Sequence, residues 1–292
     1  MVIGAALVKE LRERTGAGMM DCKRALVEAE GDLEQASELL RKSGQTKADK
    51  KAARVAAEGT VLVKGTTDGH KYVVVEVNSE TDFVAKDENF AGFAATVAEA
   101  ALAGQFADVA ALMASESDGK TLETRRQELV AKVGENIAVR RFQVLQSSET
   151  IGSYSHMGRI GVLIELQGGD SGLARDLAMQ VAATSPRYVS AAEVPGDELA
   201  KEREILAAQA LQEGKPEDIV QKMVEGRLRK HLDEVTLTGQ PFVKDPDTKV
   251  EKLLAAVGAS ALSSVRYEVG EGIEKKEDDF VQEVMAQASQ SR

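Results

Sequence analysis

The sequence predicts an α+β fold with four parts. These are three short N-terminal helices, a body of two related α+β subdomains, an inserted antiparallel helical hairpin and a C-terminal helix. Three observations predict this fold: a weak repeat runs through the body, two amphipathic segments interrupt its second copy, and helical patterns flank both ends. At 292 residues the chain is long enough for two or three domains.

Residues 1–40 are predicted to form a compact three-helix domain. Leu7, Val8 and Leu11 share one face of a first helix, and a glycine-containing turn ends it. A second helix follows, and Asp32 is placed to cap a third. The apolar faces are small, so this domain lies near the lower size limit for independent stability.

Residues 41–57 are predicted to be a basic linker. Positions 41–54 hold six basic residues, one acid and few apolar residues, which indicates an exposed segment that is either helical or flexible. Through residue 54 the net charge is +2, and the rest of the chain carries −13. The acidity therefore belongs to the body.

The body contains an internal repeat that defines two subdomains, residues 58–146 and residues 147–194 joined with 233–269. The β-branched run YVVVEV at 72–77 returns as GVLIEL at 161–166, an offset of 89 residues. Matching segments near the end of each copy are offset by 125 residues, so the second copy holds an insertion of roughly 37 residues.

Residues 195–232 fit that insertion. Two amphipathic segments separated by a Gly-Lys-Pro break predict an antiparallel helical hairpin. Its apolar stripe either packs on the chain's own body or meets a partner. The module 270–292 is predicted to carry a short amphipathic helix around Phe280 and Val284, after an exposed linker.

Composition excludes several function classes. Aromatic residues make up 4% of the chain and the net charge is −11, which argues against base stacking and a broad grip on nucleic acid. One cysteine, Cys22, and three histidines give no disulfide framework and no multi-histidine metal site. No phosphate-binding loop or nucleophile elbow occurs, so we expect neither a cofactor nor enzymatic catalysis.

The chain also lacks the patterns of export and of membrane insertion. The N-terminal apolar run is short and has no basic region before it, so no signal peptide is expected. No stretch of about 18 apolar residues occurs, and nothing is expected to span a membrane. We expect a soluble cytoplasmic protein.

The segment after the first repeat strand stands out. Thr81, Asp82, Phe83 and Val84 lie in a polar stretch, whereas the second repeat has GGDSG at 168–172 and no aromatic residue there. Because the two copies share their frame and differ in this loop, the loop is a candidate functional site. Phe83 either anchors the loop against the core or is an exposed aromatic wedge beside a carboxylate, aimed at a partner.

Two segments identify a family. LRERTGAGMMDCKRAL at 11–26 and EVNSETDFVAK at 76–86 are long and specific, and the repeat, the hairpin insertion and the tail fit the same plan. Over essentially its whole length the chain resembles the elongation factor Ts family, the nucleotide-exchange factors of the GTPase elongation factor Tu.

The resemblance implies a fold and a mode of action. The head would be a ubiquitin-associated-type (UBA-like) domain, and the hairpin a coiled-coil protrusion. The loop of Thr81, Asp82, Phe83 and Val84 would enter the GTPase near its Mg²⁺ site, with Phe83 as a wedge and Asp82 making polar contacts. Further partner contacts are implied for Lys9, Leu11, Met19 and His156.

Two other function classes stay open. The three-helix head could bind nascent chains or ubiquitin-type partners as a chaperone-like module, and an enzyme is the third alternative. The sequence also leaves open whether the hairpin binds the GTPase, pairs with a second copy of the chain in a homodimer, or stands free.

Overall fold

The computed structural model describes residues 3–212 and 217–274. Its head consists of α1 (Ala5–Thr15), α2 (Met19–Glu28) and α3 (Leu33–Lys51). Apolar side chains from the three helices, Cys22 among them, form the head's core. Gly16 ends α1 with a positive φ of 68°, and the Asp32 carboxylate caps α3 by accepting from Gln35 N–H at 2.9 Å.

Of the two alternatives for the basic segment after residue 40, the helical one applies up to Lys51, because α3 continues to that residue. Small residues allow the second half of this helix to pack closely on α7 (Leu122–Val133): Gly44 faces Ala131, and Ala48 is fully buried in the core of the first subdomain. The boundary predicted at residue 40 thus falls inside one continuous helix. Arg41, Lys42 and Lys50 of this helix are exposed.

The first subdomain is a three-stranded antiparallel sheet covered by helices. Strands β1 (Glu58–Gly65), β2 (Lys71–Ser79) and β5 (Ala138–Gln146) pair in the order β1-β2-β5. Alternation along β2 turns Val73, Val75 and Val77 towards the helices, where they pack in one core with α5 (Glu88–Ala103). The helices of this subdomain are α4 (Asp82–Ala85), α5 (Glu88–Ala103), α6 (Val109–Ala114) and α7, and a small hairpin joins β3 (Glu116–Ser117) to β4 (Lys120–Thr121).

The second subdomain repeats this plan, as the sequence offsets predict. Strands β6 (Thr150–His156), β7 (Ile160–Gln167) and β10 (Ser260–Glu268) pair in the order β10-β7-β6. Strand β6 thus corresponds to β1, β7 to the central strand β2, and β10 to β5. Helix α8 (Ser171–Thr184) corresponds to α5 and covers the sheet. The remaining elements are the short 3-10 helix η1 (Ala191–Glu193), β8 (Pro241–Phe242), β9 (Asp245–Lys249) and α11 (Val250–Ala256).

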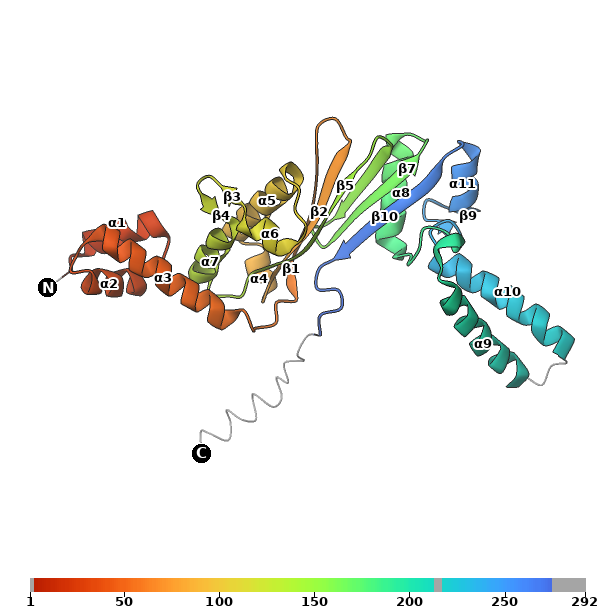
Figure 1. Ribbon diagram of the computed structural model, residues 1–292, viewed down its shortest axis with the longest axis horizontal. Coiled ribbons are helices and arrows are strands. Elements are labelled where there is room, and N and C mark those ends of the chain that lie inside the picture. Colours follow the sequence, from red (N-terminus) through yellow and green to blue (C-terminus); the bar gives the residue numbers. More distant parts are fainter. Residues whose placement is uncertain (1–2, 213–216, 275–292) are drawn as a thin grey trace.

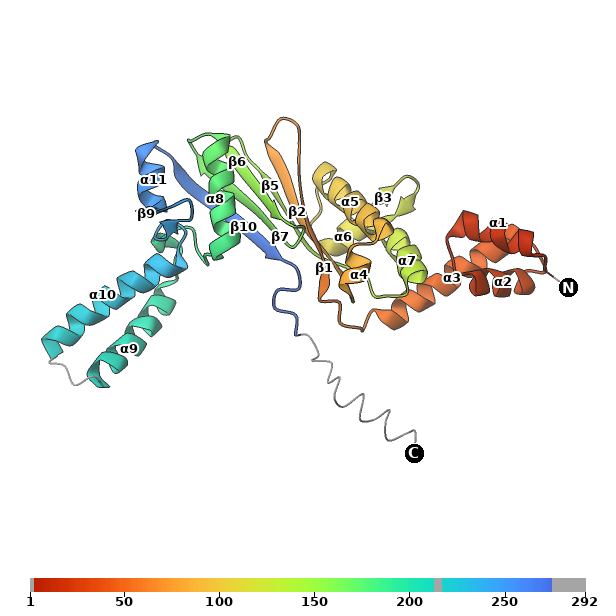
Figure 2. The ribbon, with the colours of Figure 1, turned by 180° about the vertical axis from the view of Figure 1, so that it is seen from behind.

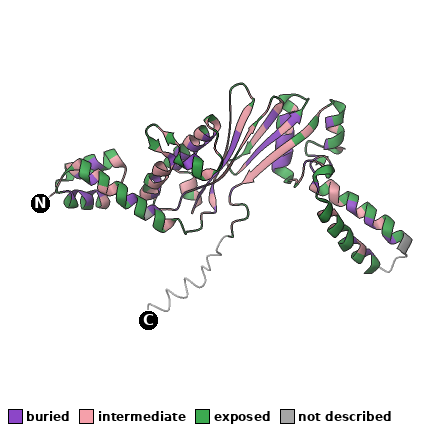
Figure 3. Cartoon of the chain, viewed as in Figure 1, coloured by how far each residue is buried: buried purple, intermediate pink, exposed green. Residues whose placement is uncertain are grey.

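The two sheets pack face to face between the helices, with α5 to α7 on one side and α8 on the other (Figures 1 and 2). Val61 and Val74 of the first sheet meet Leu163 of the second in a buried layer. Gly161 makes this approach close, because a Cβ there would lie 2.5 Å from a Val61 methyl group. Figure 3 shows the buried residues concentrated along these strands and on the helix faces that cover them.

The inserted segment forms the predicted hairpin of two helices, α9 (Gly196–Gln212) and α10 (Glu217–Val235), which projects from the body in Figure 1. The apolar stripe is largely used between the two helices, where Leu206, Ala210, Val220, Val224 and Leu228 form a small core. Among the described residues of the hairpin, the large apolar side chains of Ile205, Leu211 and Ile219 stay exposed. The Gly-Lys-Pro break and the predicted helix around Phe280 lie outside the described residues.

Within residues 3–212 and 217–274, no helix combines the length and the apolar character needed to cross a membrane.

Candidate functional site

The candidate loop is a single turn of helix that presents one aromatic ring. Helix α4 begins directly after β2, and Thr81 caps it by accepting from Val84 N–H at 3.4 Å. Phe83 is 81% exposed, so the alternative in which it anchors the loop against the core does not apply. In the second subdomain Asp170 caps α8 shortly after β7, and no helical turn intervenes.

The neighbours of Phe83 anchor the turn. Val84 and Ala85 are half-buried and pack against the core of the first subdomain. Asp82 pairs with Lys86 one turn later at 2.7 Å, and the hydrogen bond from this ammonium lowers the pKa of the Asp82 carboxyl. Aliphatic residues therefore face inward, while an aromatic ring and an ionised carboxylate face outward.

A second tie comes from the segment that follows α7. The Glu135 carboxylate accepts two hydrogen bonds from Thr81, from the backbone N–H at 3.0 Å and from the hydroxyl at 2.7 Å. The neighbouring Asn136 donates its backbone N–H to Glu80 at 2.6 Å. The side-chain amide of Asn136 also donates to the carbonyl of Arg54, just beyond α3, at 2.8 Å. Glu135 and Asn136 thus connect the Phe83 loop to the backbone just beyond α3.

Strand β2 also carries a buried carboxylate, on the face opposite to the one that the helices cover. Glu76 has no exposed surface and accepts hydrogen bonds from Arg140, Arg141, Asn78 and the backbone N–H of Gly270. Burial acts to raise the pKa of Glu76, but the Gly270 N–H and the two arginines outweigh it, and the pKa is lowered. This network joins the end of the described chain to the first subdomain.

The implied contact residues of the head divide into exposed and buried ones. Lys9 is exposed and lies 3.7 Å from Glu13, and Met19 is 57% exposed at the start of α2. Leu11, by contrast, has no exposed surface, because it faces the head's own core from α1. The implied partner contact through the Leu11 side chain is therefore corrected: this side chain packs inside the head. Met20, 75% exposed, has the apolar surface that Leu11 lacks.

His156 lies at the last position of β6. Its ring stacks on Tyr154 with 6.2 Å between centroids, and its Nδ1 lies 3.2 Å from the Tyr154 hydroxyl. The next residue, Met157, is 87% exposed and has a positive φ of 51°. The carbonyl of Gly158 then accepts from Val61 N–H at 2.7 Å, which attaches this turn to β1.

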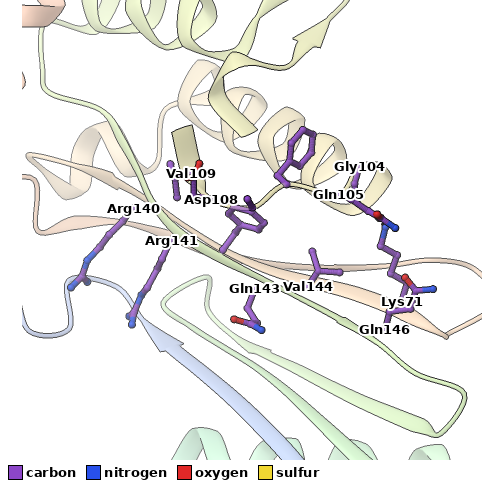
Figure 4. Close-up of a pocket in the computed structure, with 13 residues that line it drawn as sticks. Lys71, Gly104, Gln105, Asp108, Val109, Arg140, Arg141, Gln143, Val144 and Gln146 are labelled. Carbon is purple, nitrogen blue, oxygen red and sulfur yellow. Dashed lines mark hydrogen bonds between the residues drawn. The ribbon is translucent and has the colours of Figure 1, made fainter. Parts of the chain in front are cut away.

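Two cavities in the described part of the chain are not lined by Phe83. One of about 500 Å³ lies between the α5–α6 connection and β5, and Figure 4 shows Arg140 and Arg141 extending from it towards the end of β10. Another of about 690 Å³ separates the head from α7 and is lined mostly by polar residues. Among the described residues, no group of three His, Cys, Asp or Glu side chains is arranged to hold a metal ion.

Sequence reasoning missed Glu135 and Asn136. The repeat contains a signal for the first of them: AKVG at 131–134 is followed by Glu135, whereas the matching AAVG at 255–258 is followed by Ala259. The same comparison of copies singles out Phe83. Asn136 has no comparable signal, because its side-chain amide donates to backbone carbonyls far away in sequence.

The similarity of this sequence to known proteins extends over the whole chain. The family model described as elongation factor TS matches residues 80–271. Elongation factor Ts of Halorhodospira halophila is 58% identical over 291 residues, covering 100% of both chains. Its namesake from Thioalkalivibrio sulfidiphilus is 59% identical over 99% of both chains, and that of Legionella pneumophila (strain Paris) is 54% identical over 98% of both. The chain belongs to the elongation factor Ts family.

Proposed function

We propose that this chain is a translation elongation factor that binds the GTPase elongation factor Tu and promotes the release of its GDP. Family membership supports this proposal, and one observation carries it furthest. Phe83 is a large apolar side chain held almost fully in solvent on an anchored turn, at a place where the second repeat has no counterpart. An exposed aromatic ring on a fixed backbone has the properties of a binding hot spot.

In the proposed mechanism, contacts between the GTPase and this chain replace contacts between the GTPase and its bound Mg²⁺ and nucleotide. The turn of Thr81, Asp82, Phe83 and Val84 enters the GTPase beside its Mg²⁺ and nucleotide site. Phe83 separates apolar elements there, and the ionised Asp82 makes polar contacts. The fixed turn reaches this geometry with little loss of conformational entropy on binding.

Linkage then accounts for turnover without covalent chemistry. If the bound factor weakens GDP binding a hundredfold, GDP weakens the factor equally, which corresponds to about 2.7 kcal/mol of coupling. Excess GTP reloads the GTPase and expels the factor. In this scheme the chain needs no nucleophile, general base, cofactor or metal ion, and it is not an enzyme.

The remaining contacts belong to the same proposal. Lys9 and Met19 on the head and His156 on the body are exposed and available to the GTPase. Neither nucleic acid nor a membrane surface is a proposed partner. The exposed apolar side chains of the hairpin suit either the GTPase or pairing with a second copy of the chain.

Stopped-flow release of a fluorescent GDP from elongation factor Tu tests the function. Wild-type chain should accelerate release, and Phe83→Ala should lower that acceleration by at least about tenfold. Val257→Ala is the matched control, because Val257 is also an exposed apolar residue, 56% accessible, at the end of α11 in the other subdomain. Equal acceleration by Phe83→Ala and wild type would remove Phe83 from the mechanism.

A second candidate function rests on the head. Met19, Met20 and Val27 expose apolar surface on one short helix, which would also suit a chaperone-like module. Replacing Met19 and Met20 with serine separates the alternatives. Unchanged GDP release together with loss of another protein partner would assign the head to that second function.

A further inference from the structure

The Glu135 carboxylate uses both of its oxygens to bind Thr81, the residue that caps α4. Its two oxygens accept separately from Thr81, one from the backbone N–H and one from the hydroxyl. The same hydroxyl oxygen accepts from Val84 N–H at the other side, so the three groups form a chain from Glu135 into α4. Hydrogen bonds to a carboxylate are stronger than those between neutral groups.

Helix α4 needs such a contact. It has four residues, Asp82 to Ala85, and a helix of one turn is unstable in isolation because nucleation fixes several residues for few hydrogen bonds. Phe83 adds no packing to hold it, since its ring is exposed. The inward side chains Val84 and Ala85 are only half-buried. The direction in which Phe83 points therefore depends on its polar ties.

Glu135 is itself held on a fixed support. Gly134 ends α7 with a positive φ of 84°, and its carbonyl accepts from Lys51 at the end of α3. Asn136 is buried and bonded to Glu80 and to the backbone beyond α3. The residues on both sides of Glu135 are thus tied to other elements, and the carboxylate reaches Thr81 from a defined position.

We propose that Glu135 is a positioning residue for nucleotide exchange: it holds Thr81 so that α4 presents Phe83 in the conformation that the GTPase accepts. This inference rests on the proposed exchange function. It assigns to Glu135 no contact with the GTPase or with nucleotide. Its effect passes through Phe83 alone.

The test compares single and double variants in stopped-flow GDP release. Glu135→Ala removes both acceptors and should lower the acceleration of release roughly tenfold, because α4 loses its charged anchor. Glu135→Gln should restore part of that loss, since its amide can accept from Thr81 N–H and donate to the Thr81 hydroxyl. Glu128→Ala is the control, because this α7 carboxylate pairs with Lys120 and not with α4.

The decisive readout is non-additivity with Phe83→Ala. If Glu135 acts by placing Phe83, adding Glu135→Ala to Phe83→Ala causes no further loss of acceleration. A multiplied loss in the double variant, or wild-type acceleration by Glu135→Ala when Phe83→Ala is impaired, would overturn the inference. An unimpaired Phe83→Ala variant would instead overturn the proposed function. If Glu135→Ala does not fold, Thr81→Val tests the same contact in the same double-variant design.

Discussion

Arg141 donates its Nε–H to Glu76 at 2.6 Å, and the carboxylate that accepts it has no exposed surface. The two residues stand directly opposite each other in the pairing of β2 with β5. The guanidinium also stacks on the Tyr267 ring at 4.1 Å and reaches the carbonyl of Glu268 at 3.2 Å. One ion pair in the first sheet thus holds the last strand of the second.

Replacing Glu76 should therefore destabilise the whole body. Glu76→Ala leaves two arginines and the Gly270 N–H without their common acceptor, and we expect a loss of about 2–4 kcal/mol in the free energy of unfolding. Unfolding in urea, followed by circular dichroism, measures this loss.

The repeat supplies the matched control. Glu165 occupies the corresponding position on β7 and is only partly buried; its carboxylate accepts from Ser263 at 3.0 Å. We expect Glu165→Ala to cost less than about 1 kcal/mol. Equal losses for the two variants would show that the buried Glu76 network stabilises the fold no more than the single Glu165 contact does.

The lowered pKa of Glu76 predicts a pH dependence. A carboxyl group whose pKa is lower in the folded chain contributes full stability above its unfolded pKa, about 4.3, and loses the contribution as the pH falls towards the folded value. The difference in unfolding free energy between wild type and Glu76→Gln should be constant above about pH 5.5 and shrink in more acidic solution. A difference that grows on acidification would contradict a lowered pKa.

The close contact of the two sheets predicts a steric effect at Gly161. An added methyl group would lie 2.5 Å from Val61, 2.9 Å from Val63 and 3.0 Å from Val74, all within the layer between the sheets. Gly161→Ala should cost about 1–3 kcal/mol because the sheets must move apart. Thermal unfolding checks this.

Gly92→Ala is the control for that substitution. Gly92 lies on the exposed face of α5, where an added Cβ meets nothing within 4 Å. Alanine is the better helix former there, so we expect a gain of about 0.5–1 kcal/mol. Stabilisation by both substitutions would refute the close approach of the sheets at Gly161.

The repeat explains how much of the fold was predictable. Matching segments and their changing offset locate both sheets and the hairpin insertion, because local patterns repeat with the fold. The packing of one sheet on the other was not predicted. Alternation along β2 separates Val73, Val75 and Val77 from Val74, but it does not say what covers Val74.

The errors at the head have the same physical origin. The segment after residue 40 is helical and packed because Gly44 and Ala48 permit close approach to α7, a tertiary contact that composition does not reveal. Leu11 lies in a family motif, which implies a partner contact, and also on the apolar face of α1, which predicts burial. The side chain is buried, so the apolar face is the better guide at this position. For Phe83, the sequence alone left anchoring and exposure equally open.

The turn around Phe83 allows stability and function to be separated in adjacent residues. Phe83→Ala should change the free energy of unfolding by less than about 0.5 kcal/mol, because the ring is 81% exposed and packs on little. Val84→Ala should cost about 1–2 kcal/mol, because that side chain packs on the core of the first subdomain. Urea unfolding of both variants, beside GDP release, then tests the assignment. If Phe83→Ala proved as destabilising as Val84→Ala, its loss of exchange would be explained by a disordered turn, and the wedge role would lose its support.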